Sequence, residues 1–212
     1  MKEAVYQTIR ERILYLEYEP GQILNEKKLA QEFGVSRSPI KDVLNHLEWE
    51  HFVRVIPRTG SMVTEIEFSR AMNVYMVRFN IESFEAGIAE SQFSSTHQVK
   101  LKELYDSCED ILDKKDPKAL AKIDTALREV IHDAAGNPVL ADVSDKLYSQ
   151  TFRLWFSVML KNGWPDEVDA VKRELEKLIG YFASGNSNEF GTIRRAQLVN
   201  HFERLRQKFL GI

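Results

Sequence analysis

Cysteine, long apolar runs and net charge are all scarce in this sequence, and each scarcity excludes a class of protein. The single cysteine, Cys108, cannot form a disulfide within the chain, which suits a reducing compartment. No apolar run approaches the roughly 20 residues needed to cross a bilayer. Segment 1–13 is amphipathic and charged, without the uninterrupted apolar core of a secretory signal. We therefore expect a cytoplasmic protein with no membrane partner.

The sequence also has no large excess of charge of either sign. The formal net charge is only −3 at pH 7, so the chain as a whole has no excess of basic residues that would attract nucleic acid. Basic and acidic side chains are nearly balanced over residues 1–65 as well. Any binding of nucleic acid must therefore depend on where a few cations are placed. What the sequence does have is the composition of a globular protein, with 43% hydrophobic and 29% charged residues.

The pattern of the first 66 residues predicts helices at its start. Apolar residues recur at helical spacing over 1–17, and the turn residues of "YEPGQ" end this helix. Asn25 is a good N-cap for a second helix that runs to Phe33. Gly34 supplies the left-handed turn with which many helices end.

A third helix and a hairpin complete this segment. Ser36 is the expected N-cap of the third helix, whose buried face is formed by Ile40, Val43, Leu44 and Leu47. Residues 52–66 alternate and are rich in β-branched side chains, with Gly60 near the expected hairpin tip. Two short helices joined by a glycine-containing turn and followed by a hairpin are typical of a winged helix-turn-helix. We therefore predict a DNA-binding domain over residues 1–66.

The third helix offers polar side chains that suit a DNA groove. Arginine can bridge two acceptors on guanine or clamp a phosphate, asparagine can pair with adenine, and a helix N-terminus attracts phosphate. The candidate contacts on this helix and beside it are Lys27, Ser36, Arg37, Ser38, Lys41, Asn45, Arg58 and Gly60. The alternative is a charged, solvated surface on a small helical domain, which the balanced local charge does not exclude.

The rest of the chain, residues 67–212, has helical periodicity throughout. The loop "NGWPDE" at 162–167 is expected to separate two of its helices, because it contains Gly163 and Pro165. The other predicted helices cover about 69–92, 97–114, 117–135, 138–161, 166–184 and 189–210. The fold class is therefore mainly α: a winged helix-turn-helix followed by an all-α antiparallel bundle. The aromatic side chains Phe152, Trp155 and Phe156 are expected in its core.

The N-terminal motifs resemble those of the GntR family of bacterial transcription regulators. The matching positions are Pro20-Gly21, Leu24, Glu26, Leu29-Ala30, Gly34-Val35-Ser36-Arg37, Pro39, Leu44, Leu47, Val53, Gly60 and Val63. The resemblance implies that Arg37, Ser38 and Lys41 contact operator DNA, assisted by Lys27 and the hairpin tip at Gly60. Two positions depart from the family pattern: Lys41 replaces an arginine and loses its bidentate fork, and His51 replaces a glycine.

The helical remainder resembles the FCD effector domain of the FadR subfamily, through "VRFNIESFEAGIAE", "DTALREVIHDAAGNPVL" and "LVNHFERL". This resemblance implies a homodimer that binds a palindromic operator and changes its DNA affinity when a small molecule binds the helical domain.

Many FCD domains hold a divalent metal with one aspartate and three histidines. In this sequence the aspartate is Asp124 and the third histidine is His201, whereas the other two positions are Arg128 and Leu175. We therefore expect no cofactor and no resident metal, with Asp124 and His201 as the remaining ligand candidates. We expect Arg128 instead to pair with Asp124 and to bind an anionic metabolite.

Two further arginines, Arg78 and Arg153, are candidates for the same effector cavity. The alternatives are a surface ion pair for Arg128 and a pair with Glu82 for Arg78.

Two other functions remain open at this point. One is a metal-dependent enzyme built on the helical bundle, although the sequence has no nucleophile elbow, no Gly-rich phosphate loop and no repeated Glu-x-x-His motif. The other is a structural DNA-binding protein without an effector. We expect a regulator and not an enzyme.

Overall fold

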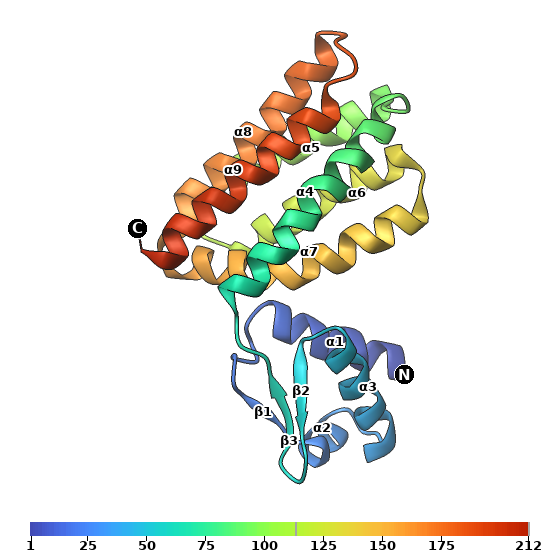
Figure 1. Cartoon of the computed structure of the whole chain (residues 1–212), viewed down its shortest axis with the longest axis vertical. Coiled ribbons are helices and arrows are strands. Elements are labelled where there is room, and N and C mark those ends of the chain that lie inside the picture. Colours follow the sequence, from blue (N-terminus) through green and yellow to red (C-terminus); the bar gives the residue numbers. More distant parts are fainter. Residues whose placement is uncertain (113, 212) are drawn as a thin grey trace.

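The computed structural model describes residues 1–112 and 114–211, apart from the side chains of 162 and 163. A small N-terminal domain lies below a larger helical bundle, and one extended segment leads from the first into the second (Figure 1). Each part has its own hydrophobic core, the first built from residues between Val5 and Val63 and the second from residues beyond Ala71. The predicted fold class, mainly α with an N-terminal winged helix-turn-helix, is confirmed.

Three helices pack together in the N-terminal domain. They are α1 (Lys2–Leu14), α2 (Glu26–Glu32) and α3 (Arg37–Trp49). Ile9 and Ile13 of α1 meet Ile40 and Leu47 of α3, and all four side chains are fully buried. Burial of each such side chain stabilises the fold by roughly 1.5–3 kcal/mol, which fixes the direction of α3.

The helix-turn-helix depends on how α2 begins and ends. Asn25 caps α2 as predicted, because its side chain accepts hydrogen bonds from the backbone N–H groups of Lys27 and Lys28. Gly34 has φ +64°, the left-handed conformation expected at the turn. Ser36 stands at the N-cap of α3 with an extended backbone, but its side chain makes no capping bond. The expected cap through its hydroxyl is therefore wrong, and this hydroxyl is free to bind another group.

The hairpin is a three-stranded sheet in the structure. Strands β2 (Val53–Ile56) and β3 (Gly60–Val63) pair antiparallel, with Ile56 opposite Gly60. The short strand β1 (Ile23–Leu24), which the sequence did not predict, pairs with the other side of β3. β1 therefore ties the wing to the chain just before α2.

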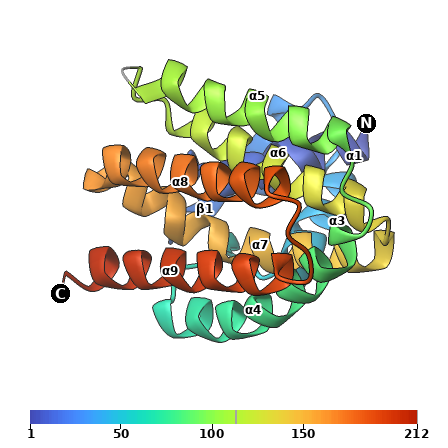
Figure 2. The ribbon, with the colours of Figure 1, turned by 90° about the horizontal axis from the view of Figure 1, so that it is seen from above.

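Within the described part of the chain, six long helices form the bundle, which Figure 2 shows from above. They are α4 (Phe68–Glu90), α5 (Ser95–Leu112), α6 (Pro117–Ala135), α7 (Pro138–Val158), α8 (Trp164–Ala183) and α9 (Phe190–Leu210). Helix α4 packs against α6, α7 and α9, and α5 packs against α6 and α8. Asp116 and Asn137 cap α6 and α7, each followed by a proline at the first helical position, where a missing N–H costs little.

The predicted loop at 162–167 is wrong. The chain passes from α7 into α8 through a π-helical segment, η1 (Met159–Gly163), without leaving helical geometry. Pro165 lies in the first turn of α8, directly after the π-helical segment, so its missing N–H coincides with the change from π-helical to α-helical bonding. The indole of Trp164 is buried and donates a hydrogen bond to the carbonyl of Leu112, which holds this junction against the end of α5.

Aromatic side chains join the two domains. Phe152, Trp155 and Phe156 of α7 are buried, as predicted for core residues. Tyr15, just after α1, packs edge-on against Phe152 and Phe156. The helical domain is therefore in direct contact with the end of α1. Within the described residues, no helix is both long and apolar enough to cross a membrane.

Candidate DNA interface and ligand sites

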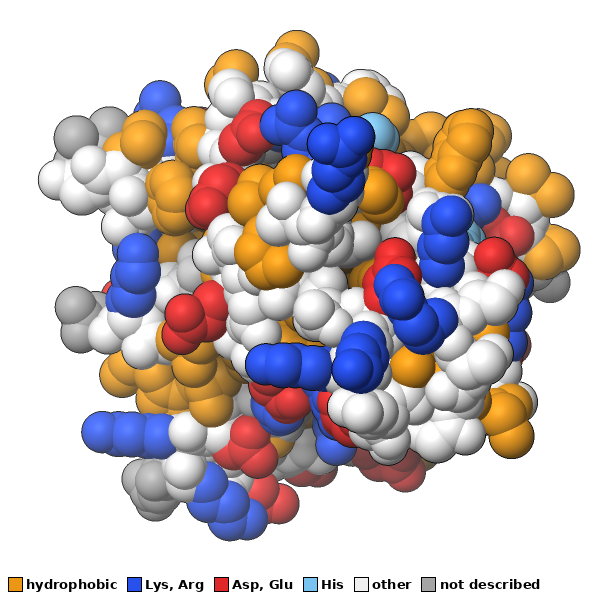
Figure 3. Space-filling view, turned by 90° about the horizontal axis from the view of Figure 1, so that it is seen from below, with side chains coloured by type: hydrophobic (Ala, Val, Ile, Leu, Met, Phe, Trp, Pro, Cys, Tyr) orange, Lys and Arg blue, Asp and Glu red, His pale blue; other side chains and the backbone are white. Residues whose placement is uncertain are grey.

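A groove on the N-terminal domain brings most of the predicted DNA contacts together. It encloses about 540 Å³ between the start of α2, the start of α3 and the wing. Of the eight predicted residues, those that line it are Lys27, Arg37, Lys41, Arg58 and Gly60. Figure 3 looks at this end of the molecule, where Lys and Arg side chains stand out with Asp and Glu side chains between them.

The three other predicted residues lie on α3 or at its start, outside the lining of this groove. Ser36 and Ser38 are exposed at the N-terminal end of α3, and Asn45 is half-buried farther along the helix. Because a helix N-terminus presents unpaired N–H groups, the two serines are placed where a phosphate would approach.

Arg37 extends from the first position of α3 and its side chain is 68% exposed. Its Nη2 donates a hydrogen bond to Glu26 Oε2 at 2.9 Å, across the turn between the two helices. An exposed ion pair of this kind contributes at most about 1 kcal/mol, so a phosphate or a guanine can displace the carboxylate. Glu26 therefore holds Arg37 over the groove without neutralising it permanently.

Glycine is required at the tip of the wing. Gly60 has φ +137°, and a Cβ built on it would stand 2.8 Å from the carbonyl oxygen of Leu24. Any side chain would separate β3 from β1 at this point. Arg58 also has a left-handed backbone, with φ +65°, and its side chain is exposed at the tip. The wing thus presents a cation at its outermost turn.

The interior of the bundle holds a cluster of buried ion pairs centred on Glu82 of α4. Its carboxylate accepts bonds from Arg78 at 2.7 Å and Arg194 at 2.9 Å, and Arg128 lies at 3.1 Å. All four side chains are at least 96% buried. Burial alone would raise the pKa of Glu82, but the three guanidinium groups outweigh it and hold this pKa well below its usual range.

Arg128 faces the interior as predicted, but its partners differ from the prediction. It pairs with Glu82 and with Asp145 at 3.0 Å, and its guanidinium lies over the Tyr148 ring. The expected pair with Asp124 is wrong, because the Asp124 carboxylate accepts a hydrogen bond from the Tyr148 hydroxyl at 2.7 Å. The alternative of a surface ion pair is wrong as well, since Arg128 is only 3% exposed.

The residues at the family's metal position do not fit a metal. Arg128 is a cation, Leu175 is fully buried and apolar, and His201 Nδ1 accepts a hydrogen bond from Arg204. No group of three or more His, Cys, Asp or Glu suited to an ion occurs in the part of the chain that the structure describes. The space between Glu82, Arg128, His132 and Arg194 has no room for a water-sized sphere. An ion pair of Arg128 and a hydrogen bond of Arg204 therefore occupy two of the positions at which the resemblance to FCD domains implies a metal site.

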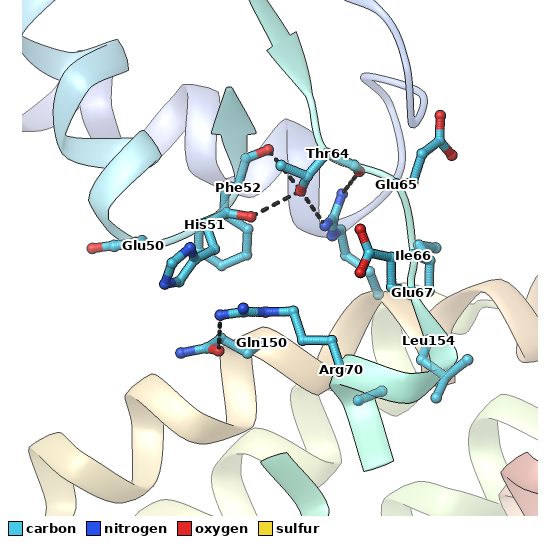
Figure 4. A pocket seen from close by; sticks show the side chains of 12 residues that line it. Glu50, His51, Phe52, Thr64, Glu65, Ile66, Glu67, Arg70, Gln150 and Leu154 are labelled. Atoms are coloured by element: carbon cyan, nitrogen blue, oxygen red, sulfur yellow. Dashed lines mark hydrogen bonds between the residues drawn. The ribbon is translucent and has the colours of Figure 1, made fainter. Parts of the chain in front are cut away.

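Of the two remaining effector candidates, only one lies in this cluster. Arg78 pairs with Glu82, the simpler alternative considered for it, and also donates to Thr151 Oγ1 at 2.6 Å. Arg153 lies instead where the two domains meet, and donates from Nη1 and Nη2 to the carbonyl and hydroxyl oxygens of Thr64, each at 2.7 Å. A cavity of about 170 Å³ lies beside it (Figure 4).

Sequence reasoning missed the residues that complete the cluster. Glu82 was considered only as a partner for Arg78, and Arg194 and His132 were not assigned to it. His132 lies between Glu85, at 2.6 Å, and Asp145, at 3.1 Å. Burial lowers the pKa of His132, but hydrogen bonds to the two carboxylates outweigh this and raise it to about 9. The spacing of Arg194 with Leu198, Phe202 and Leu205 on one face of α9 was the available signal that it points inward.

Two domain families match the chain. Residues 1–63 match the description "Bacterial regulatory proteins, gntR family", and residues 73–206 match the FCD domain. The chain belongs to the gntR family of bacterial regulatory proteins and carries an FCD domain. The resemblance to this family seen in the sequence is therefore confirmed.

Relatives of this gntR-family protein have similar domains. An uncharacterized HTH-type transcriptional regulator of Streptomyces ambofaciens is 36% identical over 78 residues, which is 37% of this chain and 33% of that protein. The match thus spans about a third of the length of this curated relative. The HTH-type transcriptional repressor RspR of Escherichia coli is 20% identical over 97% of this chain and 87% of its own. These relatives are named as regulators and not as enzymes.

The fold extends over the whole chain. The structure of E. coli McbR/YncC superposes with a TM-score of 0.84 and covers 98% of both chains, at 15% sequence identity. This likeness shows that the two chains share the order and arrangement of both domains.

Proposed function

We propose that this gntR-family protein is a transcription regulator whose affinity for operator DNA changes when a small anionic metabolite binds its helical domain. The observation that carries the proposal is the groove of about 540 Å³, in which three elements place Lys27, Arg37 and Arg58 around one space. Cations from α2, α3 and the wing then surround a single stretch of DNA. The order of the two domains, the DNA-binding domain first and the FCD domain second, supports the effector part of the proposal.

The working form that we propose is a homodimer. Helix α4 exposes large apolar side chains at Met72, Met76 and Phe84, which are four and eight residues apart and share one face. Val139 and Val143 of the neighbouring helix α7 are exposed as well. A second copy of the chain that covers this face would bury it and place two α3 helices on a palindrome.

Selection of bound sequences from random DNA tests the proposal. The full chain should enrich a palindromic motif whose half-sites are about one helical turn apart, or a multiple of it. Addition of small carboxylates to the selected complex should then change its affinity. Enrichment of no sequence at matched salt would instead favour the structural DNA-binding protein considered above.

The match of residues 73–206 to the FCD domain also supports assignment to the FadR subfamily, as the sequence predicts. No specific observation favours the alternative of a metal-dependent enzyme, since Arg128 and Leu175 replace two of the ligands that such a centre needs.

A further inference from the structure

Arg153 differs from the other buried arginines of the bundle in its partners. Arg78, Arg128 and Arg194 each lie within 4.0 Å of a carboxylate. Arg153 is 93% buried, yet it forms no ion pair with any carboxylate among the residues that the structure describes. Its hydrogen bonds go to the two neutral oxygens of Thr64. Within the described residues, no carboxylate therefore lies within 4.0 Å of this guanidinium, and Glu65 acts on it only from a greater distance.

A buried charge without a counter-ion destabilises the folded protein, because its removal from water costs several kcal/mol that neutral hydrogen-bond acceptors only partly offset. The effect is visible at Arg153 itself: burial lowers its pKa to about 10, and Glu65 only partly opposes this. In the Glu82 cluster, by contrast, the protein supplies the carboxylate. The missing partner at Arg153 points to an anion from outside the chain.

There is space for such an anion beside Arg153. The cavity of about 170 Å³ lies between the DNA-binding domain and α7, and both Arg153 and Arg70 line it. A cavity of about 150 Å³ is large enough for benzene, so this one suits a molecule of about six non-hydrogen atoms. Figure 4 shows Arg70 extending across the hollow toward Gln150. Within the described residues, the Arg70 side chain donates one hydrogen bond, to Gln150 Oε1 at 3.1 Å.

The other walls of the cavity decide the kind of anion. Phe52, Ile66 and Leu154 give it an apolar side that suits a short carbon chain. Three carboxylates also line it, which disfavours a ligand with more than one negative charge. They are Glu50, Glu65 and Glu67, and Figure 4 shows Glu50 and Glu65 pointing away from the hollow.

We propose that the cavity between the two domains binds a small monocarboxylate, held by ion pairs with Arg153 and Arg70. This proposal rests on the proposed function, since it names the place and chemical class of the effector. It differs from the sequence prediction, which placed the effector at Arg128 in the centre of the bundle, where the hollow beside Glu82 and Arg128 has no room for a water-sized sphere.

Binding at this place has a direct route to the DNA-reading helix. The hydroxyl of Thr64 donates to the backbone carbonyls of His51, at 2.8 Å, and Phe52, at 3.2 Å, immediately after α3 ends. Arg153 in turn donates to the same hydroxyl. A carboxylate that pairs with the Arg153 guanidinium in place of Thr64 breaks the link that runs from α7 through Thr64 to the residues just after α3. The ligand thereby favours a different angle between the domains.

Titration calorimetry and thermal unfolding of the full chain test this site. The probes are sodium butyrate and sodium lactate, with sodium chloride at equal ionic strength as the control and sodium succinate as the dianion. Butyrate or lactate should bind and raise the melting temperature above the chloride value, and succinate should bind more weakly. Absence of binding by both monocarboxylates, or equally tight binding of succinate, would overturn the proposal.

Two variants locate the site. Arg153→Met keeps an unbranched side chain without its charge, and Arg70→Gln changes an exposed residue. Each should weaken butyrate or lactate binding by about tenfold or more, because each removes a charged hydrogen-bond donor. The exposed Arg206→Gln variant serves as the control and should bind as the wild type does. Unchanged affinity in Arg70→Gln would contradict the proposal even if Arg153→Met failed to fold.

The outcome is separable from that of the proposed function. Sequence-specific DNA binding without carboxylate binding would leave the regulator in place and remove this effector site. Carboxylate binding without any selected operator would support this binding site and contradict the proposed DNA-binding function.

Discussion

The guanidinium of Arg128 on α6 lies 3.1 Å from the carboxylate of Glu82 on α4, and both groups are buried. The arginine stands where the resemblance to FCD domains implies a metal-binding histidine, and the glutamate pairs with two further arginines, one from its own helix and one from α9. The centre of the FCD domain is thus held by ion pairs between three helices. The stability of the bundle should depend on Glu82, the anion that the three arginines share.

Glu82→Gln should destabilise the protein strongly. The substitution removes the shared partner of Arg78, Arg128 and Arg194 and leaves three buried cations close together, a change that typically costs about 3–5 kcal/mol. Urea unfolding measures the loss, with the exposed Glu103→Gln variant on α5 as the matched control. A loss below about 1 kcal/mol relative to that control would show that the cluster does not stabilise the bundle.

His51→Gly should stabilise the N-terminal domain. His51 has φ +64° at the end of α3, where its N–H bonds to the carbonyl of Glu48 and the next N–H, of Phe52, bonds to Leu47. A non-glycine residue in this left-handed conformation costs roughly 1–2 kcal/mol, so glycine should recover about 1 kcal/mol.

Thermal unfolding measures this change. The control is His46→Gly in the interior of α3, which should destabilise by about 1 kcal/mol or more because its backbone is helical. A lower melting temperature in His51→Gly than in the wild type would contradict the strain argument.

His132 should make the bundle less stable at alkaline pH. Its pKa is raised to about 9 by Glu85 and Asp145, above the ordinary value of 6.5, so folding favours the protonated form. The stabilisation is fully present below about pH 6.5 and is lost as the pH rises through 9. The difference in unfolding free energy between the wild type and His132→Gln, measured from pH 6 to 10, should shrink by about 1–3 kcal/mol. A difference that stays constant or grows with pH would be inconsistent with this pairing.

Phe84→Asp should break the proposed homodimer. Phe84 is 62% exposed on the apolar face of α4, so a carboxylate there costs the monomer little but would be buried in the interface. Sedimentation equilibrium should show a dimer for the wild type and a monomer for the variant. The control is Val99→Asp, which places the same charge on another exposed apolar residue, on α5. If Phe84→Asp dimerised as well as Val99→Asp, the dimer interface would not lie on this face of α4.

The sequence predicted the parts of this protein that depend on local chemistry. The cap at Asn25, the left-handed turn at Gly34 and the buried face of α3 follow from neighbouring residues, and the structure has all three. The short strand β1 and the π-helical junction η1 were missed. Strand β1 has only two residues and pairs with β3, which lies more than 35 residues away in the sequence, and η1 is continuous with α7 and α8.

The interior of the bundle depends on contacts that a linear pattern does not contain. The sequence correctly predicts that Arg128 faces inward, but it predicts Asp124, one helical turn away, as the partner. Its actual partner, Glu82, comes from another helix, and Tyr148 takes the Asp124 carboxylate. Arg153 was grouped with the same cavity, although α7 carries it to the contact with Thr64 instead. Which helices face one another decides these partners.

The central claim is that α3 reads operator DNA through Arg37, and one binding measurement tests it most directly. The affinities of the wild type and Arg37→Ala are compared for the selected operator and for random DNA of equal length at the same salt concentration. The exposed Arg206→Ala variant on α9 controls for the loss of one positive charge. Arg37→Ala should lose about 1–3 kcal/mol of operator binding and most of its preference over random DNA, while the control keeps both. An Arg37→Ala protein that discriminates as well as the wild type would contradict the account.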